Sequence, residues 1–301
     1  MSTDSQAPLD AEELETAGAP ADAELSAGTT LGAVHLSVSD LQRSLAYWRD
    51  AIGLEVLGEG DGTATLGAGD RELLVFVEEP GARPADGYSG LYHVALLVPE
   101  RGDLARWLAH AARDRIALTG LSDHYVSEAI YLRDPDGHGI EIYSDRPRDV
   151  WEGQVFERMT TLPLDTEDLL GTLDDPAAEP FEGMPAGTIM GHVHLRVSSI
   201  PETIAFWRDR VGFALMAALG NQAAFLAAGG YHHHLGANTW ESAGRRKAPG
   251  GTATLRHGTI VLADGAERDR VLSRVGEHHD TDAGPVVEDP SGNAFVLDVA
   301  A

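Results

Sequence analysis

Apolar and polar residues alternate in short runs along most of the chain, and groups of these runs surround stretches with helical spacing. The run after Gly32 places Val34, Leu36 and Val38 on one face of a predicted strand. A predicted helix follows, with a polar cap before it, a glycine after it and apolar positions at Leu41, Leu45, Trp48 and Ile52. Three further alternating runs with glycine turns come next. The pattern predicts a βαβββ unit.

This unit is repeated along the chain. The segment GAVHLSVSDLQRSLAYWRDAIGL from Gly32 matches GHVHLRVSSIPETIAFWRDRVGF from Gly191 in register. A weaker pair of repeats begins at LYHVALLVPE and at LRHGTIVLAD, and these end in hairpins marked by DPDG from Asp134 and DPSG from Asp289. The sequence therefore predicts an α+β fold in which four βαβββ modules pair into two domains.

The boundaries follow from where the periodicity fades. We expect an N-terminal domain over 31–146 and a C-terminal domain over 188–301, joined by a Pro-, Gly- and acid-containing connector over 147–187. Residues 1–30 are acidic and Ala-rich, which predicts a disordered leader. They lack a basic segment followed by an apolar stretch, so the expected location is cytoplasmic.

Composition narrows the choice of partners. The 48 Asp and Glu residues against 22 Lys and Arg residues give a net charge of -26, which repels a nucleic-acid backbone. No uncharged apolar run approaches the roughly 20 residues that a membrane span needs. The chain has no Cys, so a bound metal must take His and carboxylate ligands.

Three potential ligands of this kind lie on the non-core faces of predicted strands: His35, His93 and Glu141. If two modules curve into one cup, these side chains can converge there. Two His and one carboxylate on one side of a metal leave open positions, as in non-haem Fe(II) oxygenases, and Mn(II) could occupy the same site. Any one of these residues alone is better explained as a strand histidine bonded to backbone or as a surface carboxylate, but all three at equivalent ends of repeated modules favour a metal site.

The paired modules resemble the vicinal oxygen chelate superfamily, and within it the two-domain type I extradiol dioxygenases of the catechol 2,3-dioxygenase kind. The likeness covers about Leu31 to Ala300. Glyoxalase I, fosfomycin-resistance proteins and bleomycin-binding proteins share these modules. More specific is DHYVSEAIYLRDPDGHGIEIYSD from Asp123, which looks like the final hairpin of homoprotocatechuate 2,3-dioxygenases. The resemblance implies that Glu141 is a ligand, that Tyr131 donates a hydrogen bond beside it, and that His124 contacts O₂ or a substrate hydroxyl.

The sequence also departs from that family. The family's ligands usually lie in the C-terminal domain, but here the equivalent of Glu141 in that half is Val296. The family's further active-site His has no counterpart in the run ELLVFVEE of the first module.

The C-terminal half offers a second candidate metal site formed by His194, His234 and His257. If the modules pair out of sequential order, His194 could instead replace His35 beside His93. The sequence leaves the pairing open.

The predicted function is a metal-dependent extradiol ring-cleaving dioxygenase that uses O₂ and a catechol- or hydroquinone-like aromatic. Fe(II) is the expected cofactor, with Mn(II), Zn(II) and Ni(II) as alternatives. A glyoxalase-like isomerase or lyase, in which Zn(II) or Ni(II) acts as a Lewis acid, is a second interpretation. A non-catalytic protein that sequesters an aromatic compound is a third. The sequence does not decide whether copies form a homo-oligomer.

Overall fold

The four predicted βαβββ modules are present in the computed structural model, which describes residues 18–19 and 23–300. In each of the first and third modules the helix continues into a turn of π-helix. The first module comprises β2 (Val34–Val38), α1 (Leu41–Tyr47), η2 (Trp48–Ile52), β3 (Glu55–Gly60), β4 (Thr63–Ala68) and β5 (Arg71–Glu78). The third comprises β12 (Ile189–Arg196), α6 (Ile200–Ile204), η3 (Ala205–Val211), β13 (Ala214–Leu219), β14 (Ala223–Ala227) and β15 (Leu235–Asn238).

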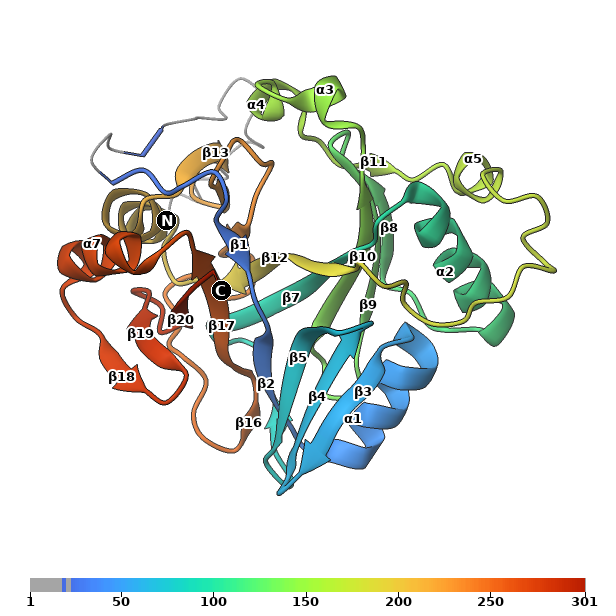
Figure 1. The fold of residues 1–301 in the computed structure, drawn as a ribbon, viewed down its shortest axis with the longest axis horizontal. Coiled ribbons are helices and arrows are strands. Elements are labelled where there is room, and N and C mark those ends of the chain that lie inside the picture. Colours follow the sequence, from blue (N-terminus) through green and yellow to red (C-terminus); the bar gives the residue numbers. More distant parts are fainter. Residues whose placement is uncertain (1–17, 20–22, 301) are drawn as a thin grey trace, which may run out of the picture.

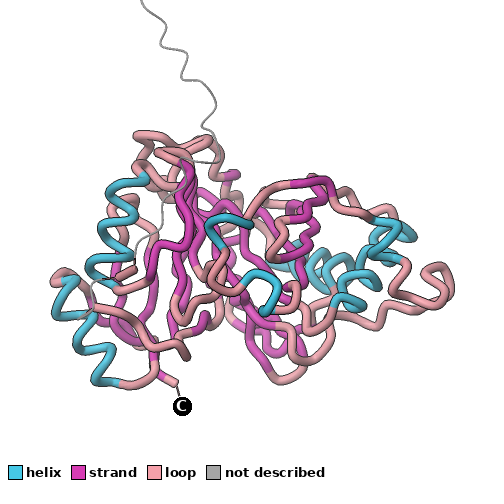
Figure 2. The backbone as a smooth tube through the Cα atoms, turned by 90° about the horizontal axis from the view of Figure 1, so that it is seen from above, coloured by secondary structure: helices cyan, strands magenta, loops and turns pink. Residues whose placement is uncertain are grey.

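The second and fourth modules have longer helices. The second comprises β7 (Gly90–Leu97), α2 (Arg101–Asp114), β8 (Gly120–Asp123), β9 (Ser127–Arg133) and β10 (Gly139–Asp145). The fourth comprises β17 (Leu255–Leu262), α7 (Gly265–Val275), β18 (His279–Thr281), β19 (Gly284–Glu288) and β20 (Ala294–Val299). Figure 2 shows that the helices lie toward the outside of the strands.

The predicted helix boundaries have the expected caps. The Asp40 side chain accepts a hydrogen bond from the Arg43 N–H at the start of α1, and Ser199 caps α6 in the same way. Gly53 and Gly212 end the two π-helical turns with φ of 94° and 117°, which only glycine adopts readily. The repeated sequence therefore produces repeated local structure.

The modules pair in a nested order and not in sequence order. One sheet joins the second and third modules in the order β11-β8-β9-β10-β7-β12-β15-β14-β13, and β7 runs antiparallel to β12 at the junction. The other joins the fourth and first modules in the order β18-β19-β20-β17-β2-β5-β4-β3, and β17 runs antiparallel to β2. Figure 1 shows both junctions near the centre of the molecule. The expected units 31–146 and 188–301 therefore each contribute half of both sheets.

Neighbouring modules also pack through their turns. Asp134, in the turn between β9 and β10, accepts a hydrogen bond from Trp48 Nε1 at 3.2 Å. Asp136 in the same turn accepts one from the Ser39 N–H at 3.0 Å and forms an ion pair with Arg43 at 2.6 Å. One apolar cluster extends through all four modules. The two sheets thus share a continuous core.

The connector contains the short elements α3 (Arg148–Trp151), α4 (Val155–Arg158), β11 (Leu162–Pro163) and α5 (Thr166–Leu170). Strand β11 pairs with β8. Three further short strands are β1 (Thr30–Leu31), which pairs with β17, and β6 (Arg83–Pro84) and β16 (Thr252–Ala253), which pair with each other.

Part of the predicted leader packs on the fold. The Leu25 N–H donates to the Gly212 carbonyl at 3.1 Å, and the Ser26 N–H donates to Glu267 Oε1 at 2.7 Å. The expectation of disorder up to residue 30 is therefore wrong for residues 23–30, because this stretch finds hydrogen-bond partners and buries Leu25. Residues 1–17 and 20–22 lie outside the described part of the chain. None of the described helices is long and apolar enough to cross a membrane.

The nested pairing predicts how the chain behaves when it is divided. Fragments 1–146 and 147–301, produced separately, should each lack cooperative thermal unfolding, because β7 and β2 lose the partner strands β12 and β17. Mixed together, they should form a stoichiometric complex with a single transition by circular dichroism. Cooperative unfolding of the isolated 1–146 fragment would show that sequential domains fold independently.

Candidate metal centre

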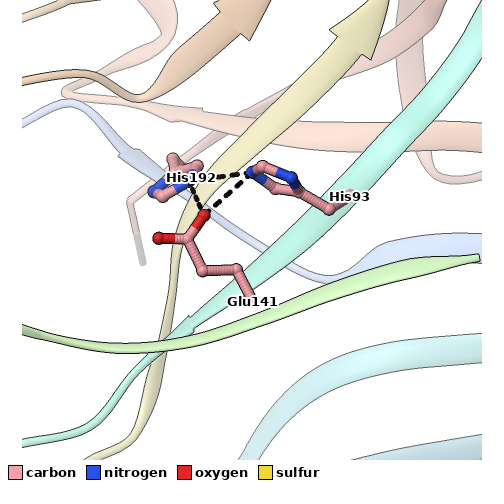
Figure 3. A group of neighbouring side chains, drawn as sticks. All are labelled: His93, Glu141 and His192. Atoms are coloured by element: carbon pink, nitrogen blue, oxygen red, sulfur yellow. Dashed lines mark hydrogen bonds and ion pairs between the residues drawn. The ribbon is translucent and has the colours of Figure 1, made fainter. Parts of the chain in front are cut away.

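Three buried side chains from adjacent strands direct their donor atoms to one point. Glu141 Oε2 lies 3.0 Å from His93 Nε2 and 3.0 Å from His192 Nε2, and the two nitrogens are 3.3 Å apart. Figure 3 shows the two rings and the carboxylate pointing toward one another. His93 is 6% exposed, Glu141 2% and His192 1%. Among the described residues, this is the one group of three such side chains close enough to hold a metal ion.

The register of the sheet that contains β10, β7 and β12 creates this convergence. Strand β10 lies parallel to β7 on one side and places Glu141 opposite Ala95. Strand β12 lies antiparallel to β7 on the other side and places His192 opposite the same Ala95. His93 precedes Ala95 by two residues and therefore shares its face. The small Ala95 side chain leaves the space in which the three donors meet.

A glycine next to His192 permits the close packing of this strand. Gly191 lies at an irregularity in the pairing of β12 with β7, between Met190 and His192. A Cβ atom at Gly191 would lie 1.9 Å from the Tyr143 hydroxyl oxygen. Glycine at this position therefore leaves room for the Tyr143 side chain, which reaches from β10 across β7 to β12 beside His192.

The donor set fits a divalent cation. The two Nε2 atoms lie 3.3 Å apart, and each lies 3.0 Å from the same carboxylate oxygen. Hydrogen bonds cannot occupy all three sides of this triangle, because if both nitrogens donate to the oxygen, neither can accept from the other. For metal–ligand bonds of about 2.1 Å, adjacent ligands are about 3.0 Å apart in an octahedron and about 3.4 Å apart in a tetrahedron. The observed triangle falls within that range. Two imidazoles and one carboxylate also match the ligand types of Fe(II), Mn(II) and Zn(II).

The protonation states suit metal binding. Burial alone would raise the pKa of Glu141, but the adjacent His192 and His93 outweigh it and hold that pKa well below its usual range. Burial lowers the pKa of His192 to about 4, although Glu141 partly opposes this shift. At neutral pH the group thus offers a carboxylate and a neutral imidazole, which are the forms that coordinate metals.

A cavity of about 650 Å³ opens above these three residues. Part of its wall is aromatic and comes from Tyr92, Phe225 and Trp240. Its polar groups include four further titratable side chains, which are His124, Tyr131, His194 and His233. A cavity of this size, with a mainly apolar lining and a few convergent polar groups, suits a small aromatic ligand.

His124 and Tyr131 form a pair in this cavity. His124 Nδ1 lies 2.8 Å from the carbonyl oxygen of Thr160, to which it must donate. A neutral His124 ring therefore accepts at Nε2 from the Tyr131 hydroxyl at 2.7 Å. Burial raises the pKa of Tyr131 well above its usual value, and the Glu141 charge raises it further, so Tyr131 keeps its proton at neutral pH. His124 and Tyr131 line the same cavity as Glu141. Their catalytic roles remain predictions.

The structure separates the other predicted ligands. His35 lies on β2 of the other sheet, where its ring stacks on that of His257 at 4.0 Å. The predicted set of His35, His93 and Glu141 therefore does not assemble. The physical reason is the nested pairing, which brings β12 and not β2 beside β7.

The second predicted site does not assemble either. His194 lies in the cavity with its ring 4.9 Å from that of His93, and His257 belongs to the other sheet. His234 accepts a hydrogen bond at Nδ1 from the Ala228 N–H at 3.2 Å. These three histidines therefore have separate environments.

His192 is the residue that sequence reasoning missed. The first strands of the modules can be aligned on their apolar faces, so that the residue before Val34 is compared with those before Val94 and Val193. This alignment places Ala33, His93 and His192 at equivalent positions. The match between repeats instead drew attention to His35 and His194, two residues further along each strand.

A histidine of the third module also lies at this site. His233, two residues before β15, lines the cavity, and its ring centroid lies 4.0 Å from that of His192.

Comparison with known proteins identifies the family. The model of the Glyoxalase/Bleomycin resistance protein/Dioxygenase superfamily matches residues 30–142 and 189–297. These two segments make up most of the chain. This protein therefore belongs to that superfamily, as the sequence resemblance predicts.

A relative and two solved structures refine the comparison. Catechol-2,3-dioxygenase of Bacillus subtilis (strain 168) is 40% identical over 280 residues, which cover 89% of this chain and 96% of that protein. The structure of a candidate dioxygenase from Bacillus subtilis subsp. subtilis str. 168 has a TM-score of 0.62 at 14% identity, covering 92% of this chain and 86% of the other. Glyoxalase I from Zea mays has a TM-score of 0.54 at 15% identity, covering 90% and 92%. The two structures establish the shared fold.

The half-buried His35 predicts a loss of stability in acid. Burial, followed by the charges of His257 and Arg256, lowers the pKa of His35 to about 4. Between about pH 6.5 and pH 4 the unfolded chain binds a proton that the folded chain excludes, so the free energy of unfolding falls as the pH falls. In His35→Gln this decrease should be smaller by on the order of 1 kcal/mol. Urea unfolding at several pH values measures it.

The exposed His278 provides the control for this experiment, because His278→Gln removes a histidine from an exposed loop. That variant should retain the pH dependence of the unchanged protein. Equal pH dependence in His35→Gln and His278→Gln would contradict the assignment of this effect to His35.

Proposed function

We propose that this chain is a metal-dependent extradiol ring-cleaving dioxygenase that acts with O₂ on a catechol- or hydroquinone-like aromatic. The observation that carries the proposal is the convergence of His93, Glu141 and His192 at the floor of a cavity with aromatic walls. The 40% identity to a catechol-2,3-dioxygenase over nearly its whole length supports this activity. The expected partners are therefore a small aromatic substrate and O₂.

Fe(II) is the metal we propose for the site. Two histidines and one carboxylate on the same side of a cation are typical of non-haem Fe(II) oxygenases, and Mn(II) is accepted by the same ligand set. When bound, such a cation lowers the pKa of a coordinated hydroxyl and offers open positions for substrate and O₂. His93, His192 and Glu141 would hold it, and all three are fixed by the strands that carry them.

The remaining cavity residues would orient the substrate and its protons. Tyr92 and Trp240, whose ring centroids are 5.4 Å apart, provide apolar surface for an aromatic ring. The buried Tyr131 hydroxyl and His124 are held 2.7 Å apart and can move or retain a proton close to the bound ring. His194 Nε2 is buried without a hydrogen-bond partner among the described residues, so it is free to contact a ligand.

The ligand assignment predicts different outcomes for two histidines. His192→Ala removes a donor from the centre, so its Fe(II) or Zn(II) affinity should fall by more than roughly 100-fold, beyond the usual cost of losing a supporting residue. His35→Ala, in the other sheet, should retain the affinity of the unchanged protein. Competition with a chromogenic chelator measures both. Comparable losses in the two variants would contradict the assignment.

The activity itself is tested with protein loaded anaerobically with Fe(II). A panel of catechols and hydroquinones should include one that drives stoichiometric O₂ uptake and forms a coloured ring-opened product. Glu141→Gln, which retains the side-chain shape but removes the charge, should lower kcat by roughly 100-fold or more.

Full iron occupancy without O₂ uptake across the panel would refute the proposal. Turnover of a substrate in the strict absence of O₂ would instead support a glyoxalase-like isomerase. Tight binding of an aromatic compound that persists in Glu141→Gln, without turnover, would support sequestration.

A further inference from the structure

Three side chains beside the cavity form a continuous chain of hydrogen bonds. His232 Nε2 lies 2.8 Å from Asp145 Oδ1, and His232 Nδ1 lies 2.8 Å from His233 Nδ1. His233 lines the cavity and lies against His192. The Asp145 carboxylate is thus connected through His232 to a histidine next to a candidate metal ligand.

The carboxylate determines which ring nitrogens carry protons. An ionised carboxylate can only accept, so His232 must donate to Asp145 from Nε2. In a neutral His232 ring, Nδ1 then has no proton and accepts from the Nδ1–H of His233. The Nε2 of a neutral His233 is therefore left with its lone pair. No hydrogen bond to that atom is found in the described part of the chain.

Packing keeps this arrangement in place. His232 is fully buried, and its ring centroid lies 4.0 Å from that of Tyr231 and 5.5 Å from that of Trp151. His233 is 8% exposed, which is consistent with a residue that meets solvent only through the cavity. The Asp145 side chain is 24% exposed, so water can solvate its charge. A carboxylate that fixes the tautomer of a histidine is a recurrent means of orienting an imidazole in enzymes.

We propose that Asp145 and His232 are positioning residues for His233, which they hold as the tautomer with a bare Nε2 facing the cavity. There Nε2 accepts a hydrogen bond from a hydroxyl of the bound substrate. This inference rests on the proposed function, because a catechol-type substrate supplies that hydroxyl. Neither positioning residue supplies a donor atom to the candidate metal centre.

The test uses Asp145→Asn in the full chain. An asparagine retains the side-chain shape, but its amide can donate to His232 Nε2, which reverses the proton positions along the chain and leaves His233 protonated at Nε2. Nitrogen-15 NMR of the Zn(II)-loaded protein reports these tautomers directly, with the His233 signals assigned from His233→Gln. We expect a bare Nε2 on His233 in the unchanged protein and a protonated Nε2 in a substantial fraction of Asp145→Asn.

Kinetics of the Fe(II)-loaded protein provide the second measurement. Asp145→Asn should lower kcat by roughly 10- to 100-fold with little change in KM, because the substrate still fits the cavity but its hydroxyl meets a donor. The matched control is Asp114→Asn, which changes another Asp–His contact, that of Asp114 Oδ2 with His110 Nδ1 at 3.0 Å on α2. That variant loses the same charge and should keep the unchanged kcat.

Several results would overturn the inference. A protonated Nε2 on His233 in the unchanged protein would do so without any variant. An unchanged His233 tautomer in Asp145→Asn would also overturn it. Any fall in kcat would then come from a structural change and not from the tautomer of His233. If the unchanged, iron-loaded protein cleaves no catechol, the proposed function fails, while the NMR measurement still decides whether Asp145 positions His233.

Discussion

The antiparallel pairing of β7 with β12 is the contact on which the candidate site depends. It joins modules that are almost 100 residues apart in the sequence and places His192 opposite Ala95, next to His93. Strand β10, which is parallel to β7, then completes the group with Glu141. A shift of one residue in either pairing would turn a ligand to the opposite face of the sheet. The candidate metal centre is therefore a direct consequence of strand register.

The second sheet shows what the same architecture does without the ligands. It joins the first and fourth modules through β2 and β17, and the positions equivalent to His192 and Glu141 are Ala33 and Val296. His257 remains, but it stacks on His35 and has no carboxylate beside it in the described structure. The substitutions replace a buried charge by apolar volume, and burying an uncompensated charge is costly. The sheet of the first and fourth modules can thus serve to support the sheet that carries the candidate site.

The sequence was sufficient to predict the modules but not their partners. Alternation, caps and glycine stops are local features, and they placed the strands, the helices, His93 and Glu141 correctly. The modules pair through their first strands, and these strands have nearly the same apolar pattern in all four modules. The sequence therefore does not show which first strand pairs with which. Assuming sequential pairing put His35 where the structure has His192. The signal for His192 was present in the alignment of three first strands.

The same limit applies to the histidines around the centre. His233 and His232 follow a glycine turn and precede a short strand, so no periodicity indicates which of them faces the cavity. Their orientation depends on Asp145, which lies on β10 four residues after Glu141 and on the same face of that strand. A single strand thus supplies both a candidate metal ligand and the carboxylate that orients a neighbouring imidazole. Because both are fixed to the same rigid element, the sheet sets the distance between the candidate ligand Glu141 and the carboxylate that orients the histidines of the loop.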